Sequence, residues 1–264
     1  MLASRDPPAV RHYKAGLAAY ENEQPEKAIA HLAQAIDKQQ AYLEALSLRA
    51  RAHAALGEYA KARQDLAVLL DIEHQPRAMA LLGYYLNRSN LHEQAIGWHK
   101  GAIESGFKSV AVYNNHGFSH LRNHDLRKAL AALDRAIALD GDCAAPLHNR
   151  ALARLTLSKG NDHFLRNAML DIEKAIASDR TSGATYRTAT RIYALASQSD
   201  STYKSQAFEC FRLALKHGID LEKEIKGSKT YQFILDRHKD APQVEVTKMP
   251  PTSLPSAARL LDPW

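Results

Sequence analysis

The sequence predicts an all-α fold made of about six copies of a helix–turn–helix repeat, closed by helices after the last copy. One observation is a helix ending that recurs six times, with a small residue, a bulky residue four positions later and usually alanine after three more. The copies are Ala28/Leu32/Ala35, Ala62/Leu66/Leu69, Ala95/His99/Ala102, Ala129/Leu133/Ala136, Ala168/Ile172/Ala175 and Ala207/Phe211/Ala214. The other observation is their spacing, because the first small residues follow one another at 34, 33, 34, 39 and 39 residues.

A first helix is predicted upstream of each copy. In the first four copies a small residue lies twelve positions before the alanine, at Gly16, Ala50, Gly83 and Gly117. Small residues let two helices approach closely, and the bulky residues fill the space between them. A helix, a short turn and a second helix at a period near 34 residues resembles the tetratricopeptide repeat. The resemblance covers about 210 residues and implies a right-handed superhelical α–α solenoid.

The predicted repeat array spans residues 9–217, after an N-terminal extension at 1–8. Its units are residues 9–42, 43–75, 76–109, 110–143, 144–181 and 182–217. Units five and six carry about five extra residues, which we place in the polar connections "SKGNDHFLR" and "SQSDSTYK". The last repeat of a solenoid exposes a hydrophobic end, and residues 218–240 are predicted to cap it with two short helices separated at Gly227.

The C-terminal segment 241–264 is rich in proline, shows little periodicity and is expected to be flexible. Its last nine residues, "SAARLLDPW", are either a frayed terminus or a docking peptide.

The 264 residues carry a net charge of +6, most of it between residues 143 and 240, without a run of five or six basic residues. Nucleic-acid binding is therefore not expected.

The sequence contains neither a signal-peptide pattern nor an apolar run long enough for a membrane span. Two cysteines, Cys143 and Cys210, are too few for a disulfide framework and are expected to be reduced structural thiols. We therefore expect a cytoplasmic protein without membrane association.

The stretch "HGFSHLRNH" places His116, His120 and His124 four residues apart, on one face of a helix. Such spacing suits either a metal site or helix packing. Aligned on the repeat, His116 and His120 take positions that pack against the second helix of the same repeat, and His124 falls at the turn. No His-Glu-x-x-His motif accompanies them, so no metal, cofactor or catalytic residue is expected.

The candidate binding site comes from the resemblance. In tetratricopeptide-repeat proteins the first helices line the concave surface, and positions two, five, nine, twelve and thirteen tend to contact ligands. Aromatic, arginine and amide side chains at these positions suit peptide recognition. The predicted partner-binding residues are Tyr13, Leu17, Tyr20, Arg51, Arg77, Tyr84, Asn87, Arg88, Asn114, Phe118, Arg122, His148, Leu152, Tyr186, Thr190 and Tyr193. The two-carboxylate clamp of chaperone-binding members is not expected, since units four to six match it only at Asn149 and Arg187.

The predicted function is a non-enzymatic scaffold or adaptor that binds a protein or peptide through the concave groove, without a small-molecule substrate. The alternative is a regulatory subunit or detached region of a bacterial signalling enzyme. The segments "GATYRTATRIYALASQSD", "AFECFRLALKHGID" and "SKTYQFI" resemble repeat regions attached to bacterial serine/threonine kinases, although no kinase motif is present. The oligomeric state is left open.

Overall fold

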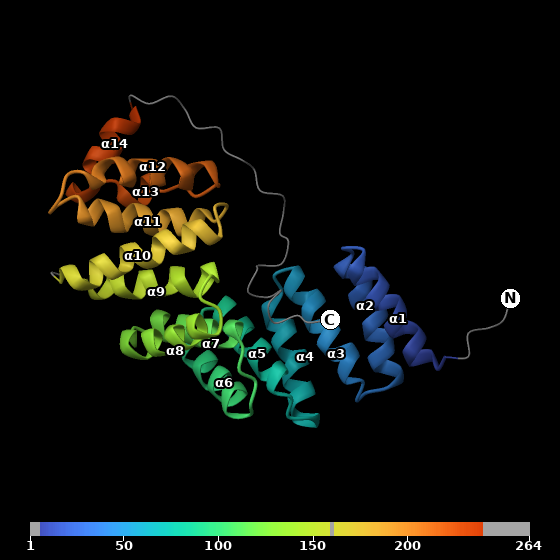
Figure 1. Cartoon of the computed structure of the whole chain (residues 1–264). Coiled ribbons are helices and arrows are strands. Elements are labelled where there is room, and N and C mark those ends of the chain that lie inside the picture. Colours follow the sequence, from blue (N-terminus) through green and yellow to red (C-terminus); the bar gives the residue numbers. More distant parts are fainter. Residues whose placement is uncertain (1–5, 159–160, 240–264) are drawn as a thin grey trace. The chain divides into compact units, whose positions relative to one another are not determined.

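The structure is a computed structural model that describes residues 6–158 and 161–239 (Figure 1). All regular elements within these ranges are helices. They divide into two compact units, one ending at Asn123 and the other beginning at His124. The predicted flexible tail at 241–264 and residues 1–5 of the predicted extension lie outside the described residues.

In its described residues, the first unit consists of three helix pairs followed by a single helix. Its helices are α1 (Pro8–Glu21), α2 (Pro25–Lys38), α3 (Leu43–Ala55), α4 (Tyr59–Ile72), α5 (Pro76–Arg88), α6 (His92–Glu104) and α7 (Val110–Arg122). Prolines begin α1, α2 and α5. They suit the first helical turn, because its backbone N–H groups have no carbonyl acceptor within the helix and the missing N–H of proline costs nothing there. The turns after α1, α3 and α5 contain Glu23, Gly57 and Asn90 with positive φ angles of 57°, 75° and 59°. The same turn geometry therefore ends the first helix of each of these repeats.

The predicted close approach of paired helices is confirmed in repeats one and three. A Cβ atom added to Gly16 on α1 would lie 2.7 Å from Leu32 Cγ on α2. A Cβ added to Gly83 on α5 would lie 2.6 Å from His99 Cε1 on α6. Leu32 and His99 are fully buried. Since each site leaves no room for a methyl group, only glycine fits opposite these side chains without a shift.

The second unit continues the pattern and ends in short helices. It comprises α8 (Leu126–Leu139), α9 (Ala144–Leu157), α10 (Asp162–Ser178), α11 (Gly183–Ala196), α12 (Tyr203–Lys216), α13 (Glu222–Ile225), the 3₁₀ helix η1 (Lys229–Tyr231) and α14 (Gln232–Lys239). The extra residues of unit six lie in the connection between α11 and α12, as predicted. In unit five the prediction is partly wrong, because α10 begins at Asp162 and is 17 residues long. Asn161 caps it by accepting a hydrogen bond from the His163 amide at 3.0 Å, which extends the helix into the predicted connection.

The end of the second unit is covered by α13 and α14. Leu221, Ile225 and Ile234 are at most 2% exposed and belong to one cluster with Phe211 of α12. Gly227, where the sequence indicates a break, has a φ of 83° and separates α13 from η1. The apolar side of the last helix pair is thereby withdrawn from water.

Candidate partner-binding face

Charge is distributed unequally between the first and the second helices of the repeats. The first helices α1, α3, α5, α7, α9 and α11 hold eleven Lys and Arg residues but two Asp and Glu residues. The second helices α2, α4, α6, α8, α10 and α12 hold thirteen against eleven. The positive charge of the described helices is therefore concentrated on the first helices, and α5, α7, α9 and α11 contain no carboxylate at all.

Some of these arginines are neutralised by buried carboxylates. In repeat two, Arg49 Nε and Nη2 donate to Asp65 at 2.9 and 2.6 Å. In repeat five, Arg150 Nε and Nη2 donate to Asp171 at 2.9 and 2.7 Å. Arg49 directly precedes Ala50, and Arg150 directly precedes Ala151 at the same position of its unit. Each aspartate directly precedes the bulky residue of its second helix. The bidentate pair therefore joins the two helices of a repeat at one fixed position.

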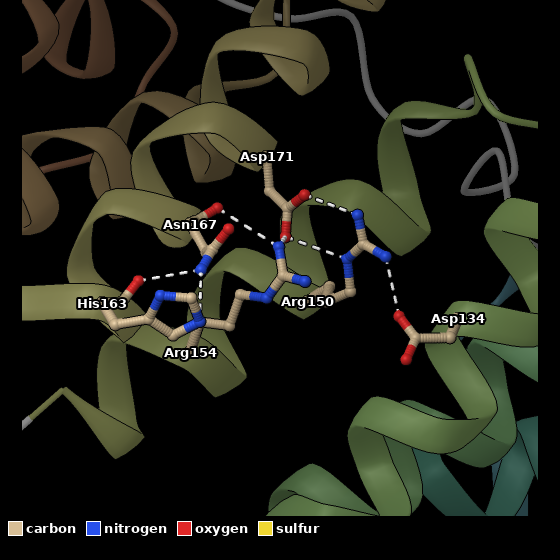
Figure 2. Close-up of polar contacts among 6 residues, drawn as sticks. All are labelled: Asp134, Arg150, Arg154, His163, Asn167 and Asp171. Atoms are coloured by element: carbon tan, nitrogen blue, oxygen red, sulfur yellow. Dashed lines mark hydrogen bonds and ion pairs between the residues drawn. The ribbon is translucent and has the colours of Figure 1, made fainter.

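Figure 2 shows how the pair in the second unit is extended. Asp171 also accepts a hydrogen bond from Arg154 Nη1 at 2.5 Å, and Arg154 donates to the carbonyl of Asn167 at 3.3 Å. Arg150 Nη1 donates to Asp134 on α8 at 2.7 Å. Burial acts to lower the pKa of Arg150, but the hydrogen bonds and charges of Asp171 and Asp134 outweigh it and raise the pKa. These arginines hold α8, α9 and α10 together and are engaged within the protein.

Arg88 and Arg122 differ, because both are exposed and no carboxylate within the described ranges forms an ion pair with either. Arg88 Nε donates to the Tyr59 hydroxyl at 3.1 Å, and its guanidinium carbon lies 5.3 Å from the centre of that ring. Tyr59 in turn packs on Tyr85, with ring centres 6.0 Å apart. The Arg88 guanidinium is thus fixed on an aromatic surface without an acidic partner of its own.

Phe118 lies one helical turn before Arg122 and is half-buried. Its ring meets His92 edge-on at 5.9 Å. His92 Nδ1 lies 3.0 Å from Asn87 Oδ1, and Asn87 Nδ2 donates to Ser119 Oγ at 2.8 Å. Burial, and then the charge of Arg122, lower the pKa of His92. A polar network under α7 therefore positions the partly exposed Phe118 ring.

The predicted residues of α1 and α3 are half-buried and make aromatic contacts. Tyr13 packs on Tyr42 with ring centres 5.2 Å apart. The Arg51 guanidinium lies 5.0 Å from the Tyr20 ring centre, so α1 and α3 meet through a cation–π contact. Leu17 is also half-buried. On α5, Arg77 lies 5.5 Å from the Phe107 ring centre.

Six of the predicted residues are buried in packing positions, at most 7% exposed. They are Tyr84, Asn87, Asn114, Tyr186, Thr190 and Tyr193. On α11, Tyr186 and Tyr193 hold the unit positions that Asn114 and Asn87 hold on α7 and α5, and they are likewise turned inward. Tyr186 stacks on His217 with ring centres 5.6 Å apart, and Tyr193 donates to Glu173 at 3.0 Å.

Arg187 and Arg191, which the sequence reasoning did not select, are partly or fully exposed on α11. The signal for them is the net positive charge of a helix without carboxylates.

On α9, Leu152 is half-buried and His148 Nδ1 lies 3.1 Å from Thr185 Oγ1. Burial, followed by the charge of Arg187, lowers the pKa of His148 to about 4.

The histidine stretch forms a packing cluster. His116 and His120 have their Nε2 atoms 3.1 Å apart, and the next ring is His99 on α6, centred 6.5 Å from that of His116. His116 thus contacts the second helix of the preceding repeat. His124 lies in the turn with a φ of 63° and is exposed. In the described part of the chain, no group of three or more metal-ligating side chains could hold an ion.

The two cysteines are not activated. Burial raises the pKa of the Cys210 thiol to about 12, with the Glu209 charge as a smaller cause. Burial also raises the pKa of Cys143. Since the thiolate is the reactive form, both thiols are unsuited to nucleophilic chemistry.

Among the described helices none combines the length and apolar character that a membrane crossing requires.

Comparisons with known proteins agree with this fold. Residues 13–75 match the family model described as Tetratricopeptide repeat. Comparison with curated protein sequences found no match. Among solved structures, PilF of Pseudomonas aeruginosa is 15% identical with a TM-score of 0.62, covering 87% of this chain and 97% of its own.

Two further solved structures are similar. MamA (residue 41 to the end) of Desulfovibrio magneticus RS-1 is 17% identical with a TM-score of 0.61, covering 68% of this chain and 99% of its own. YrrB, described as a tetratricopeptide-repeat protein with an unusual peptide-binding site, is 14% identical with a TM-score of 0.56, covering 68% and 90%. At such identities these likenesses establish the fold alone. The predicted tetratricopeptide-repeat resemblance and all-α repeat fold are confirmed.

Proposed function

Because the chain folds as tetratricopeptide-type helix pairs, we propose that it is a non-enzymatic scaffold or adaptor that binds a protein partner through its first helices. The contact surface is the first-helix face, defined as Tyr13, Leu17, Tyr20, Arg51, Arg77, Arg88, Phe118 and Arg122 on α1, α3, α5 and α7. The observation that carries the proposal is the combination of partly exposed aromatics with arginines held on aromatic rings along successive first helices.

Such a surface suits protein recognition for two physical reasons. Aromatic and arginine side chains supply most of the binding free energy in protein interfaces. Arginines already stacked on tyrosines, as Arg51 is on Tyr20 and Arg88 on Tyr59, lose little conformational freedom on binding. YrrB, which shares the fold, is described as having a peptide-binding site, and this supports the proposal by analogy.

The test is capture of partners from a lysate of the native host, identified by mass spectrometry and repeated with variants. The double variant Arg88→Glu/Arg122→Glu reverses two exposed charges on the face. The matched control is Arg127→Glu, which reverses an exposed charge in the first turn of the second helix α8. A partner retained by the control and lost by the double variant supports the proposal. Equal capture by all three proteins refutes it.

A regulatory role beside a serine/threonine kinase is a second candidate. It is favoured by the resemblance of residues 183–234 to repeat regions attached to bacterial kinases. These residues form α11, α12 and the helices that cover them, so the resemblance follows one packed segment of the second unit. A kinase among the captured proteins would favour this role, and its consistent absence would refute it.

The proposal includes a cytoplasmic location. Both Cys143 and Cys210 are free thiols, which a reducing compartment preserves. Fractionation of the native host followed by immunoblotting tests the location. Recovery in a membrane or extracellular fraction would contradict it.

A further inference from the structure

The chemistry of the partner follows from the charge of the first helices. The helices α5 and α7 contribute Arg77, Arg88 and Arg122 and contain no Asp or Glu. The partly buried Arg49 of α3 and Arg150 of α9 have their carboxylates inside the protein, in Asp65 and Asp171. Arg88 and Arg122 lack such a partner within the described residues and are exposed. A carboxylate from another molecule would supply the missing acid.

Resting on the proposed function, we propose that the first-helix face at α5 and α7 binds an extended acidic segment of its partner, with two carboxylates three residues apart. Arg88 and Arg122 each receive one carboxylate. Phe118, one turn before Arg122, receives an apolar side chain of the same segment.

The spacing of the carboxylates is a consequence of the repeat. Arg88 follows Gly83 by five residues and Arg122 follows Gly117 by five, so the two arginines hold equivalent positions. Their helices α5 and α7 are in direct contact. Packed helix axes lie about 8–10 Å apart, and equivalent positions on them are separated by a similar distance. An extended chain advances about 3.3 Å per residue, so residues three apart span about 10 Å.

The Arg88 side chain is prepared for this contact. Its Nε atom is occupied by the Tyr59 hydroxyl at 3.1 Å, and its guanidinium carbon lies 5.3 Å from the centre of the Tyr59 ring. The terminal Nη groups are the donors that a carboxylate would meet. A fixed planar fork binds a carboxylate with a smaller entropic loss than a flexible ammonium group.

A protein segment suits this surface better than a nucleic acid. The exposed charges are arginines separated by aromatic and apolar side chains, with Phe118 between Arg88 and Arg122 along the chain. A phosphate backbone requires a continuous series of basic contacts. The helices α1 and α3 also carry the exposed Glu21 and Glu44, which would repel a continuous polyanion.

The inference is tested by selecting random displayed peptides of about 12 residues against the full chain, with removal of peptides that bind Arg88→Glu/Arg122→Glu. The selected peptides should be acidic, with Asp or Glu three residues apart. Moving one acid to the adjacent position, or replacing it by its amide, should weaken binding about tenfold. The substitution Arg88→Glu should weaken peptide binding by a similar factor, and Arg88→Lys should weaken it less. The control Arg127→Glu should leave peptide binding unchanged. Binding should weaken several-fold between about 0.05 and 0.3 M salt.

The possible failures are distinguishable. If the selected peptides are neutral or basic, or if none is selected, the acidic-segment inference is wrong. The proposed function still stands in that case if partner capture depends on Arg88 and Arg122. If capture is independent of both arginines, the proposed function fails as well. If a single-stranded RNA oligomer binds and acidic peptides do not, and the double variant abolishes that binding, the ligand is a nucleic acid and the inference is overturned.

Discussion

Replacing Asp171 by alanine removes a carboxylate that Arg150 and Arg154 share in the second unit (Figure 2). The Asp171 side chain is 4% exposed, against 17% for Arg150 and 21% for Arg154. Breaking a buried ion pair by removing one partner costs about 3–5 kcal/mol, because a charge remains unpaired. Since Arg150 keeps Asp134 and both arginines retain some access to water, we expect the lower end, about 3 kcal/mol of unfolding free energy.

The assay is urea unfolding followed by circular dichroism, with hydrogen exchange of α9 and α10 to locate the loss in the second unit. The matched control is Asp134→Ala, which removes a side chain that is 55% exposed and bonds to Arg150. Exposed pairs contribute about 0–1 kcal/mol, so this variant should remain near the wild type. If Asp171→Ala loses no more stability than Asp134→Ala, the shared carboxylate does not hold these helices together.

The remaining predictions concern packing. Gly83→Ala should destabilise the first unit by about 1–3 kcal/mol, because the new methyl group meets the His99 ring. Gly97→Ala, with open space around it, should stabilise by up to about 1 kcal/mol; equal melting temperatures would refute the contrast. Burial lowers the pKa of His99 from 6.5 to about 3, so the unfolded chain binds the proton first. The contribution of neutral His99 to the free energy of unfolding is therefore fully present above about pH 6.5, and it is lost as the pH falls toward 3. The variant His99→Leu should lose less stability over that window, and identical pH profiles would refute this. Ile234→Ala should cost about 3 kcal/mol in the second unit, measured by urea unfolding, and a loss below about 1 kcal/mol would show that α14 does not cover the core.

The packing positions of the repeat could be predicted because they are local in sequence. A small residue followed at a fixed distance by a bulky one is repeated often enough to define the helix pairs. The glycine contacts at Gly16 and Gly83 confirm this. Even His99 was assigned correctly, since it takes the position that Leu32 and Leu66 hold in other repeats.

Exposure on the first helices was harder to predict. Tyr84 and Asn87 lie at positions that tend to contact ligands in tetratricopeptide-repeat proteins, yet both are buried. Exposure depends on how closely the neighbouring first helix packs, which a single repeat does not encode. In unit six, Tyr186 and Tyr193 take the positions of Asn114 and Asn87 and are buried for the same reason.

The partly buried arginine–aspartate pairs leave a signal in the sequence. Arg49 and Arg150 precede the small residue, and Asp65 and Asp171 precede the bulky residue, in two repeats of different length. A recurrence at matching positions of two helices indicates that the side chains meet. Recognising it would have separated the arginines engaged in the fold from Arg88 and Arg122.

The central claim is that a partner docks on the first helices of the first unit, and site-specific cross-linking tests it most directly. Phe118 on α7 is replaced by p-benzoylphenylalanine, and in a second protein Trp98, a partly exposed aromatic on the second helix α6, is replaced in the same way. After irradiation in the native host, a partner should be cross-linked from position 118 and not from position 98. A partner cross-linked from position 98 alone, or from neither position, would contradict the assignment of the binding face.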